Sequence, residues 1–341
     1  MALAPPITDY RLPITDYHFP LYIACRNPTT HMSSSHYKAP TLLFNRHVET
    51  IYPSLVRNVK LPPPLRERIT TPDDDFLDID WYRANSKKCV IISHGLEGNS
   101  TRAYVTGMAR AFLSAGINVA AWNYRGCSGE MNRQRRFYHS GATDDLGTVI
   151  DHAGREFDEI FLVGFSLGGN ITLKYLGEPN VHKAIRKAIT FSVPIDLYNS
   201  CLEISKPHNW VYSERFLKSL KKKVKEKAAV RNDINVDRLD SIKSLKEFDD
   251  HFTGPLHGFR DAIDYYTKCS AIHFIKNIRV PTLLVSALND PFLSPECYPV
   301  EKHPYLTTEF TKRGGHVGFA LFDQNGLYWS EIRALSFIET R

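Results

Sequence analysis

Short apolar runs alternate with amphipathic segments along the chain from about residue 65 onward. Residues 66–83 hold two such runs around an Asp-rich stretch, which predicts two strands joined by a turn. Near-continuous apolar strands separated by amphipathic helices indicate an α/β fold, with a mostly parallel sheet covered by helices on both faces. Further strands are expected within 88–95, 117–126, 159–166, 183–194, 281–292 and 306–316, and helices within 101–116, 142–157, 167–178 and 328–339.

The alternation lapses between residues 197 and 274, where the chain is richly charged and its pattern favours helices. We therefore expect one α/β core in two parts, residues 40–196 and 275–341, interrupted by a helical lid over 197–274. Residues 216–230 place apolar side chains on one helical face and lysines around the rest. A solvated lid helix is the favoured interpretation of this segment, and contact with an anionic lipid surface is the alternative.

The first 39 residues differ in composition from the rest of the chain, and the sequence "PITDY" occurs there at 6–10 and again at 13–17. We expect residues 1–39 to be a poorly ordered leader; alternatively, Met32 is the natural start and residues 1–31 are foreign to the protein. The apolar run "HFPLYIAC" is too short for the core of an export signal and is preceded by charged residues. A cytoplasmic location is therefore expected.

Composition narrows the class of protein. The chain has 341 residues, of which 43% are hydrophobic, so it can bury a substantial core. Its net charge of +6 does not indicate nucleic-acid binding, and no segment approaches the roughly 20 apolar residues that span a bilayer. The six cysteines lie far apart without a Cys-x-x-Cys pair, so we expect reduced thiols rather than disulfides or a zinc site.

Ser166 is the first candidate for chemistry, within "GFSLG" at 164–168. Gly-x-Ser-x-Gly occurs by chance in roughly one protein in ten of this length, so the pentapeptide alone decides nothing. Here it comes after a buried strand and precedes a helix, the setting of a nucleophile elbow, where glycines on both sides make room for a strained serine. The alternative is that Ser166 only caps the next helix.

A serine nucleophile needs a base and an acid, and Asp290 and His316 are the candidates. Asp290 comes directly after the apolar strand "TLLVSA", and His316 comes after the next strand, in "RGGHVGF". Asp290 as a turn residue and His316 as a surface histidine are the alternatives. The backbone N–H groups of Leu167 and of Leu96, in the loop "HGLEG", are expected to form the oxyanion hole.

The chain carries, in order, the motifs "LFNRHVETIYPSLVR", "TTPDDDFLDIDW", "SHGLEGNS", "NYRGCSGE", "GFSLGGN", "FDDHFTGPLHGF", "ALNDPF" and "GGHVGF". Together these motifs resemble the YheT-like branch of the α/β-hydrolases (the AB hydrolase 4 type family). The resemblance covers about residues 40–341 and implies an α/β-hydrolase fold, a triad of Ser166, Asp290 and His316, and an oxyanion loop at "HGLEG". The early motif departs from the family pattern Asn-Gly-His-Leu-Gln-Thr at Arg46, Val48 and Glu49, in a region expected to shape the surroundings of the lid and so the substrate preference.

The resemblance implies a carboxylic-ester hydrolase, and we expect a serine esterase of short- to medium-chain acyl groups or lipids. It would work through an acyl-enzyme without metal or organic cofactor, on a small-molecule ester partner; peripheral membrane contact is not favoured. One alternative is an acyltransferase that passes the acyl group to an alcohol. The other is a binding protein that uses the same fold without turnover.

Overall fold

The computed structural model describes residues 37–322 and 326–340. The expected leader over residues 1–39 therefore lies outside the described residues except for its last three positions, and Met32 lies outside them as well. Within the described ranges, no helix has both the length and the apolar composition that crossing a bilayer requires.

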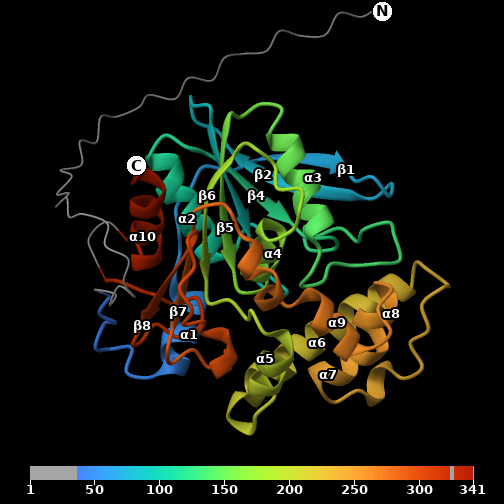
Figure 1. Ribbon diagram of the computed structural model, residues 1–341. Coiled ribbons are helices and arrows are strands. Elements are labelled where there is room, and N and C mark those ends of the chain that lie inside the picture. The colour runs from blue at the N-terminus through green and yellow to red at the C-terminus, as the bar shows by residue number, and fades with distance from the viewer. Residues whose placement is uncertain (1–36, 323–325, 341) are drawn as a thin grey trace, which may run out of the picture. The chain divides into compact units, whose positions relative to one another are not determined.

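A single eight-stranded sheet, in the order β1-β2-β4-β3-β5-β6-β7-β8, forms the centre of the fold (Figure 1). β1 pairs antiparallel with β2 and β2 with β4, whereas the pairs from β4 through β3 to β8 are all parallel. This confirms the predicted α/β class. The strands are β1 (Leu65–Thr70), β2 (Phe76–Tyr82), β3 (Lys88–Ser93), β4 (Asn118–Asn123), β5 (Glu159–Phe165), β6 (Ile185–Phe191), β7 (Thr282–Ala287) and β8 (Leu306–Thr311).

Each central strand is buried on both sides, because helices cover both faces of the sheet. On one face, side chains of α3 (Thr143–Ala153) and α4 (Leu167–Leu176) pack against the strands. On the other face the packing comes from α2 (Ala103–Ser114) and α10 (Trp329–Glu339). Helix α1 (Arg46–Val56), the first within the described residues, was not expected from the apolar pattern; it contacts the loops after β7 and β8.

Residues 197–274, here called the helical insertion, leave the sheet after β6 and return to it before β7. Its helices gather at one end of the sheet, coloured from yellow-green to orange in Figure 1. Most of them share an apolar cluster to which Phe137 and Phe292 of the core also belong, whereas α9 packs in a second cluster with Leu197. Asp249–Thr253 forms a π-helical turn within it. The helices are α5 (Leu197–Ile204), α6 (Trp210–Ala228), α7 (Leu245–Phe248), α8 (Gly254–Leu256) and α9 (Ala262–Cys269).

Helix α6 is only partly the solvated helix that the lysine-rich pattern predicts. Leu217 and Val224 are buried as expected, but Lys227 is also fully buried. The Lys227 ammonium donates to Oδ1 of Asn132 across 2.6 Å, and to the backbone carbonyls of Gln134 and Arg136. The interpretation as a uniformly solvated lysine face is therefore wrong at this position, because oxygen atoms of the core replace water around the ammonium.

Candidate active site

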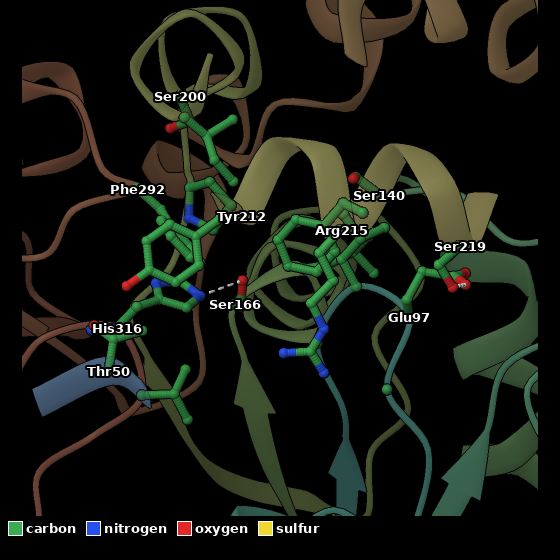
Figure 2. A pocket seen from close by; sticks show the side chains of 18 of the residues that line it. Thr50, Glu97, Ser140, Ser166, Ser200, Tyr212, Arg215, Ser219, Phe292 and His316 are labelled. Carbon is green, nitrogen blue, oxygen red and sulfur yellow. Dashed lines mark hydrogen bonds between the residues drawn. The ribbon is translucent and has the colours of Figure 1, made fainter. Parts of the chain in front are cut away.

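Ser166 lies at the sharp turn between β5 and α4, where a central parallel strand ends. Its backbone has φ 53° and ψ −119°, a strained conformation that residues other than glycine rarely adopt. The alternative that its side chain caps α4 is wrong, because that side chain makes no capping hydrogen bond. The Ser166 hydroxyl instead donates to Nε2 of His316 across 2.9 Å, the dashed line in Figure 2.

The glycines around Ser166 are explained by how closely the backbone packs at this turn. A Cβ atom on Gly164 would lie 2.6 Å from the carbonyl oxygen of Gly168. A Cβ atom on Gly168 would lie 2.4 Å from the carbonyl oxygen of Ser93, at the end of β3. Both distances are shorter than real carbon–oxygen contacts, so these positions accept only glycine if the turn is to keep its shape.

Asp290 and His316 come after β7 and β8 and lie together beside Ser166. Nδ1 of His316 lies 2.9 Å from Oδ2 and 3.1 Å from Oδ1 of Asp290. The Asp290 side chain is fully buried and that of His316 is 10% exposed. Asp290 also accepts a turn hydrogen bond from the backbone N–H of Phe292 at 2.9 Å, so it serves a turn and the histidine together. The three side chains form a continuous hydrogen-bonded chain.

Two residues of helix α1 hold the loops that carry this aspartate and histidine. The His316 backbone N–H donates to Oγ1 of Thr50 across 2.9 Å. The buried carboxylate of Glu49 accepts from Nδ2 of Asn289 at 2.6 Å and from the N–H of Gly314 at 3.2 Å. Sequence reasoning recognised a motif in this segment but predicted no role at the site for either residue. The motif itself was the signal that could have found them.

The loop after β3 passes close to Ser166. A Cβ atom on Gly95 would lie 3.4 Å from Cβ of Ser166, and the Gly95 N–H donates to the hydroxyl of Tyr104 across 2.9 Å. Leu96 and Leu167, the two residues expected to supply the oxyanion hole, both line the same cavity as Ser166. Leu167 is the first residue of α4, where the backbone N–H groups have no partner inside the helix.

His94 precedes this loop and is a structural residue. It is fully buried, and burial lowers the pKa of its imidazole to about 3. Nδ1 donates to the carbonyl oxygen of Gly95 across 2.8 Å, and Nε2 accepts from the N–H of Tyr124 at 3.3 Å. Both ring nitrogens are therefore engaged by the backbone, and the neutral ring fixes the end of β3.

A cavity of about 430 Å³ opens above Ser166 and His316. Core and helical insertion both line it, and Figure 2 shows Tyr212 and Arg215 reaching into it from the insertion. The aromatic ring of Phe292 contacts both His316 and Tyr212, with ring centres 4.2 and 4.8 Å away. Apolar side chains of both parts line it, with Ile51, Leu96 and Val317 among those of the core. Those of the insertion include Leu197, Ile204, Phe216, Leu220, Leu245 and Tyr265.

Two carboxylates of the helical insertion, Asp249 and Asp250, have partners other than His316. Asp249 accepts from the hydroxyl of Tyr266 at 2.6 Å and from that of Thr253, and burial raises its pKa to about 6. Asp250 pairs with Lys246 across 2.7 Å. Asp290 is the carboxylate in contact with the active-site histidine.

No group of three or more His, Cys, Asp or Glu side chains suited to a metal ion occurs in residues 37–322 and 326–340. Five of the six cysteines fall within these ranges and all five are free thiols, while Cys25 lies outside them. The described thiols are Cys89, Cys127, Cys201, Cys269 and Cys297.

The fold has counterparts among solved structures. An esterase of Pyrococcus furiosus superposes with a TM-score of 0.56 at 20% sequence identity, covering 83% of this chain and 95% of its own. An esterase of Exiguobacterium antarcticum superposes with a TM-score of 0.51 at 18% identity, covering 81% and 100%. The strand order, together with a serine at the turn after β5, defines an α/β-hydrolase fold.

Sequence comparison identifies the branch. Residues 84–299 match the Hydrolase_4 family, described as serine aminopeptidase, S33. YheT of Escherichia coli (strain K12) is 35% identical over 81% of this chain and 84% of its own length. Bos taurus phospholipase ABHD3 is 30% identical over 74% of this chain and 66% of its own; Saccharomyces cerevisiae monoacylglycerol lipase is 30% identical over 76% and 60%. The chain belongs to the Hydrolase_4 family of α/β-hydrolases and, within it, to the YheT-like branch.

Proposed function

We propose that this chain is a serine hydrolase that cleaves carboxylic esters of short- to medium-chain acyl groups through an acyl-enzyme on Ser166. The observation that carries the proposal is the position of His316, whose two ring nitrogens each lie 2.9 Å from a partner, the Ser166 hydroxyl and the Asp290 carboxylate. A protein that only bound its ligand would have no need of this alignment. Family relatives named phospholipase and monoacylglycerol lipase are consistent with ester cleavage.

The reaction takes two steps. Oγ of Ser166 attacks the ester carbonyl while its proton passes to Nε2 of His316, and the buried Asp290 stabilises the imidazolium through Nδ1. The oxyanion accepts hydrogen bonds from the backbone N–H groups of Leu96 and Leu167. As the tetrahedral species collapses, the alcohol leaves with the proton from His316. Water, deprotonated by His316, then releases the acid and regenerates the Ser166 hydroxyl.

The helical insertion acts in this proposal as the lid that selects the acyl group. Its apolar side chains line the cavity of about 430 Å³ beside Ser166, which suits a chain of limited length. Because burying each methylene group contributes about 0.8 kcal/mol, such a cavity favours longer acyl chains until it is filled.

Transfer of the acyl group to an alcohol is the second candidate activity. It uses the same acyl-enzyme, with an alcohol in place of water in the second step. A further relative, in Saccharomyces cerevisiae, is named medium-chain fatty acid ethyl ester synthase/esterase 2 and is 28% identical over 73% of this chain. The two activities differ only in whether water or an alcohol accepts the acyl group in the second step. A competition between water and an alcohol therefore separates them.

Hydrolysis of p-nitrophenyl esters from acetyl to decanoyl tests the main proposal. We expect wild type to hydrolyse them with a maximum at medium length, and Ser166→Ala to lose turnover while keeping its thermal melt. Adding ethanol to the wild-type reaction measures how the acyl group is divided between water and the alcohol. Free acid as the main product supports hydrolysis, and ethyl ester as the main product supports transfer. No activity on any chain length, or full activity in Ser166→Ala, would contradict the proposal.

A further inference from the structure

The carboxylate of Glu97 is buried between the loop after β3 and the helical insertion, with only 9% of its side chain exposed. Oε1 accepts from the ammonium of Lys223 across 2.6 Å and from the hydroxyl of Tyr138 across 2.8 Å. Oε2 accepts from the hydroxyl of Ser219. Figure 2 shows Glu97 and Ser219 facing each other at the side of the cavity. Lys223 and Ser219 both belong to α6, so one side chain of the core binds two positions of the insertion.

The backbone of Glu97 is as tightly fixed as its carboxylate. Its φ of 52° lies in the left-handed region that favours glycine, so other contacts must hold the residue in this conformation. Its N–H donates to the Tyr138 hydroxyl across 2.9 Å, and its carbonyl oxygen accepts from the guanidinium of Arg102 at 2.9 Å. The preceding residue is Leu96, the proposed oxyanion donor. Glu97 therefore anchors the loop segment that carries the Leu96 N–H.

Both partners of the ion pair are held in their charged forms. Burial raises the pKa of Glu97, but Lys223 and the hydrogen bonds more than offset this, and the pKa lies below its usual value. Burial lowers the pKa of Lys223, but Cys127 and Glu97 more than offset it, and the pKa lies above its usual value. Replacing a buried ion pair with apolar side chains often leaves a protein equally stable or more stable. Fold stability is therefore a weak explanation for this pair, whereas fixing one geometry is a good one.

We propose that Glu97 is a positioning residue for the reaction, which aims the Leu96 N–H at the oxyanion while Lys223 and Ser219 of the insertion hold its carboxylate. This inference rests on the proposed function. Its consequence is that the insertion contributes to catalysis as well as to selectivity, because the oxyanion loop takes its working shape only while α6 is docked against it.

The test compares Glu97→Gln and Lys223→Met with the control Lys222→Met, on one medium-chain p-nitrophenyl ester. Lys222 is the neighbouring lysine of α6, is 77% exposed and pairs only with Glu226 among the described residues. We expect kcat to fall about tenfold to a hundredfold in Glu97→Gln and Lys223→Met, below the loss expected when an oxyanion donor is removed outright. KM should stay within about twofold, because ground-state binding is unaffected. Lys222→Met should behave as wild type.

Three further readouts separate positioning from a structural role. The rate of phosphonate labelling at Ser166 should fall by the same factor as kcat/KM, because the phosphonate oxygen occupies the same oxyanion hole. The Glu97→Gln/Lys223→Met double variant should lose little more than either single variant, since the two residues act through one contact. Lys223→Arg, which keeps the charge, should recover most of kcat. If Glu97→Gln does not fold, Ser219→Ala removes one donor and should show a smaller loss of the same kind.

The inference is overturned if Glu97→Gln hydrolyses the ester and reacts with the phosphonate at the wild-type rate, or if only KM changes. It is also overturned if Lys222→Met loses as much kcat as Lys223→Met. Failure of the proposed function would look different: wild type itself would neither turn over esters nor be labelled on Ser166.

Discussion

The α/β core and the helical insertion both reach the cavity, but they are constructed differently. In the core, Ser166, Asp290 and His316 stand on turns at the ends of β5, β7 and β8, and tight backbone packing around the serine turn leaves it no freedom. The insertion consists of helices between three and 19 residues long, around a small apolar cluster. The ends of β5, β7 and β8 thus hold the three side chains in one hydrogen-bonded chain.

The insertion adds apolar side chains to the wall of the cavity beside the serine. It joins the core through apolar contacts, such as that of Tyr212 with Phe292, and through specific polar contacts. The polar ones include Lys223 with Glu97 and Lys227 with the carbonyl oxygens of Gln134 and Arg136. Changes in the core should therefore affect the chemical step most. Changes in the insertion should affect which ester is chosen, except at the contact of Lys223 with Glu97, where kcat should fall as well. The predictions below run from the largest expected effect, in the core, to the smallest, in the insertion.

The largest effect is expected from Asp290→Asn. The amide no longer selects the productive tautomer of His316 or stabilises its imidazolium, so kcat should fall by about 10⁴-fold. Steady-state kinetics on a medium-chain ester measure this loss. Asp250→Asn is the matched control in the insertion, because that carboxylate pairs with Lys246 instead, and it should keep kcat. A loss below about tenfold in Asp290→Asn would move the acid role to another group.

A smaller but clear effect is expected from Gly168→Ala at the serine turn. The added Cβ would lie 2.4 Å from the carbonyl oxygen of Ser93, so β3 and the turn must separate. Overpacking of this kind costs about 1–3 kcal/mol, and kcat should also fall as the turn shifts. Chemical denaturation measures the stability change.

Gly147→Ala is the control for that substitution. Gly147 lies within α3, and a Cβ there would meet its nearest atom, in the ring of Tyr175, at 3.6 Å. This is an ordinary contact, so replacing a helical glycine should stabilise the protein by about 0.5–1 kcal/mol. Equal stability changes in the two alanine variants would contradict the account of the turn.

In the insertion, Phe216→Ala should change selectivity and leave the chemical step in place. Phe216 lines the cavity, and shortening it makes room for longer acyl chains. The wild-type rise of kcat/KM should be at most about fourfold per methylene, from about 0.8 kcal/mol of burial. The profile should flatten or shift to longer esters in the variant, while Val230→Ala, at an exposed position after α6, keeps it. If kcat/KM depends on acyl length in Phe216→Ala as it does in wild type, the face of α6 that carries Phe216 does not select the substrate.

The smallest effect concerns Asp249 and pH. Burial raises its pKa from 3.8 to about 6 in the folded protein, so between these values the folded state binds more protons than the unfolded state. Stability from this group is therefore present at low pH and is lost as pH rises through about 6. Asp249→Asn lacks this pH-dependent contribution to stability. The Tm of the variant minus the Tm of wild type should therefore rise between pH 4 and pH 7.5. A constant Tm difference across that range would contradict the shift.

The sequence predicted the parts of this molecule that depend on local pattern. The strands, the turn at Ser166 and the positions of Asp290 and His316 after successive strands can all be read from apolar runs and glycine placement. Parallel strands end at one edge of a sheet, which is why residues 150 positions apart in the chain were expected together. The catalytic roles assigned to these residues remain predictions.

Contacts that join distant segments could not be predicted in this way. Glu49 binds Asn289, 240 residues away, and Lys223 binds Glu97, 126 residues away. A lysine-rich helix has the same pattern whether its ammonium groups meet water or buried oxygen atoms, so the burial of Lys227 left no signal in periodicity. Such pairings depend on how the insertion docks.

The central claim is that Ser166 is a nucleophile activated by His316, and organophosphonate labelling tests it most directly. Wild type is incubated with a fluorophosphonate, digested and sequenced by mass spectrometry, in parallel with Ser166→Ala. We predict one phosphonyl adduct, on the peptide that contains Ser166, and none on the alanine variant, whose thermal melt should match that of wild type. An adduct on another residue, persistent labelling of folded Ser166→Ala, or no adduct on wild type would contradict the claim.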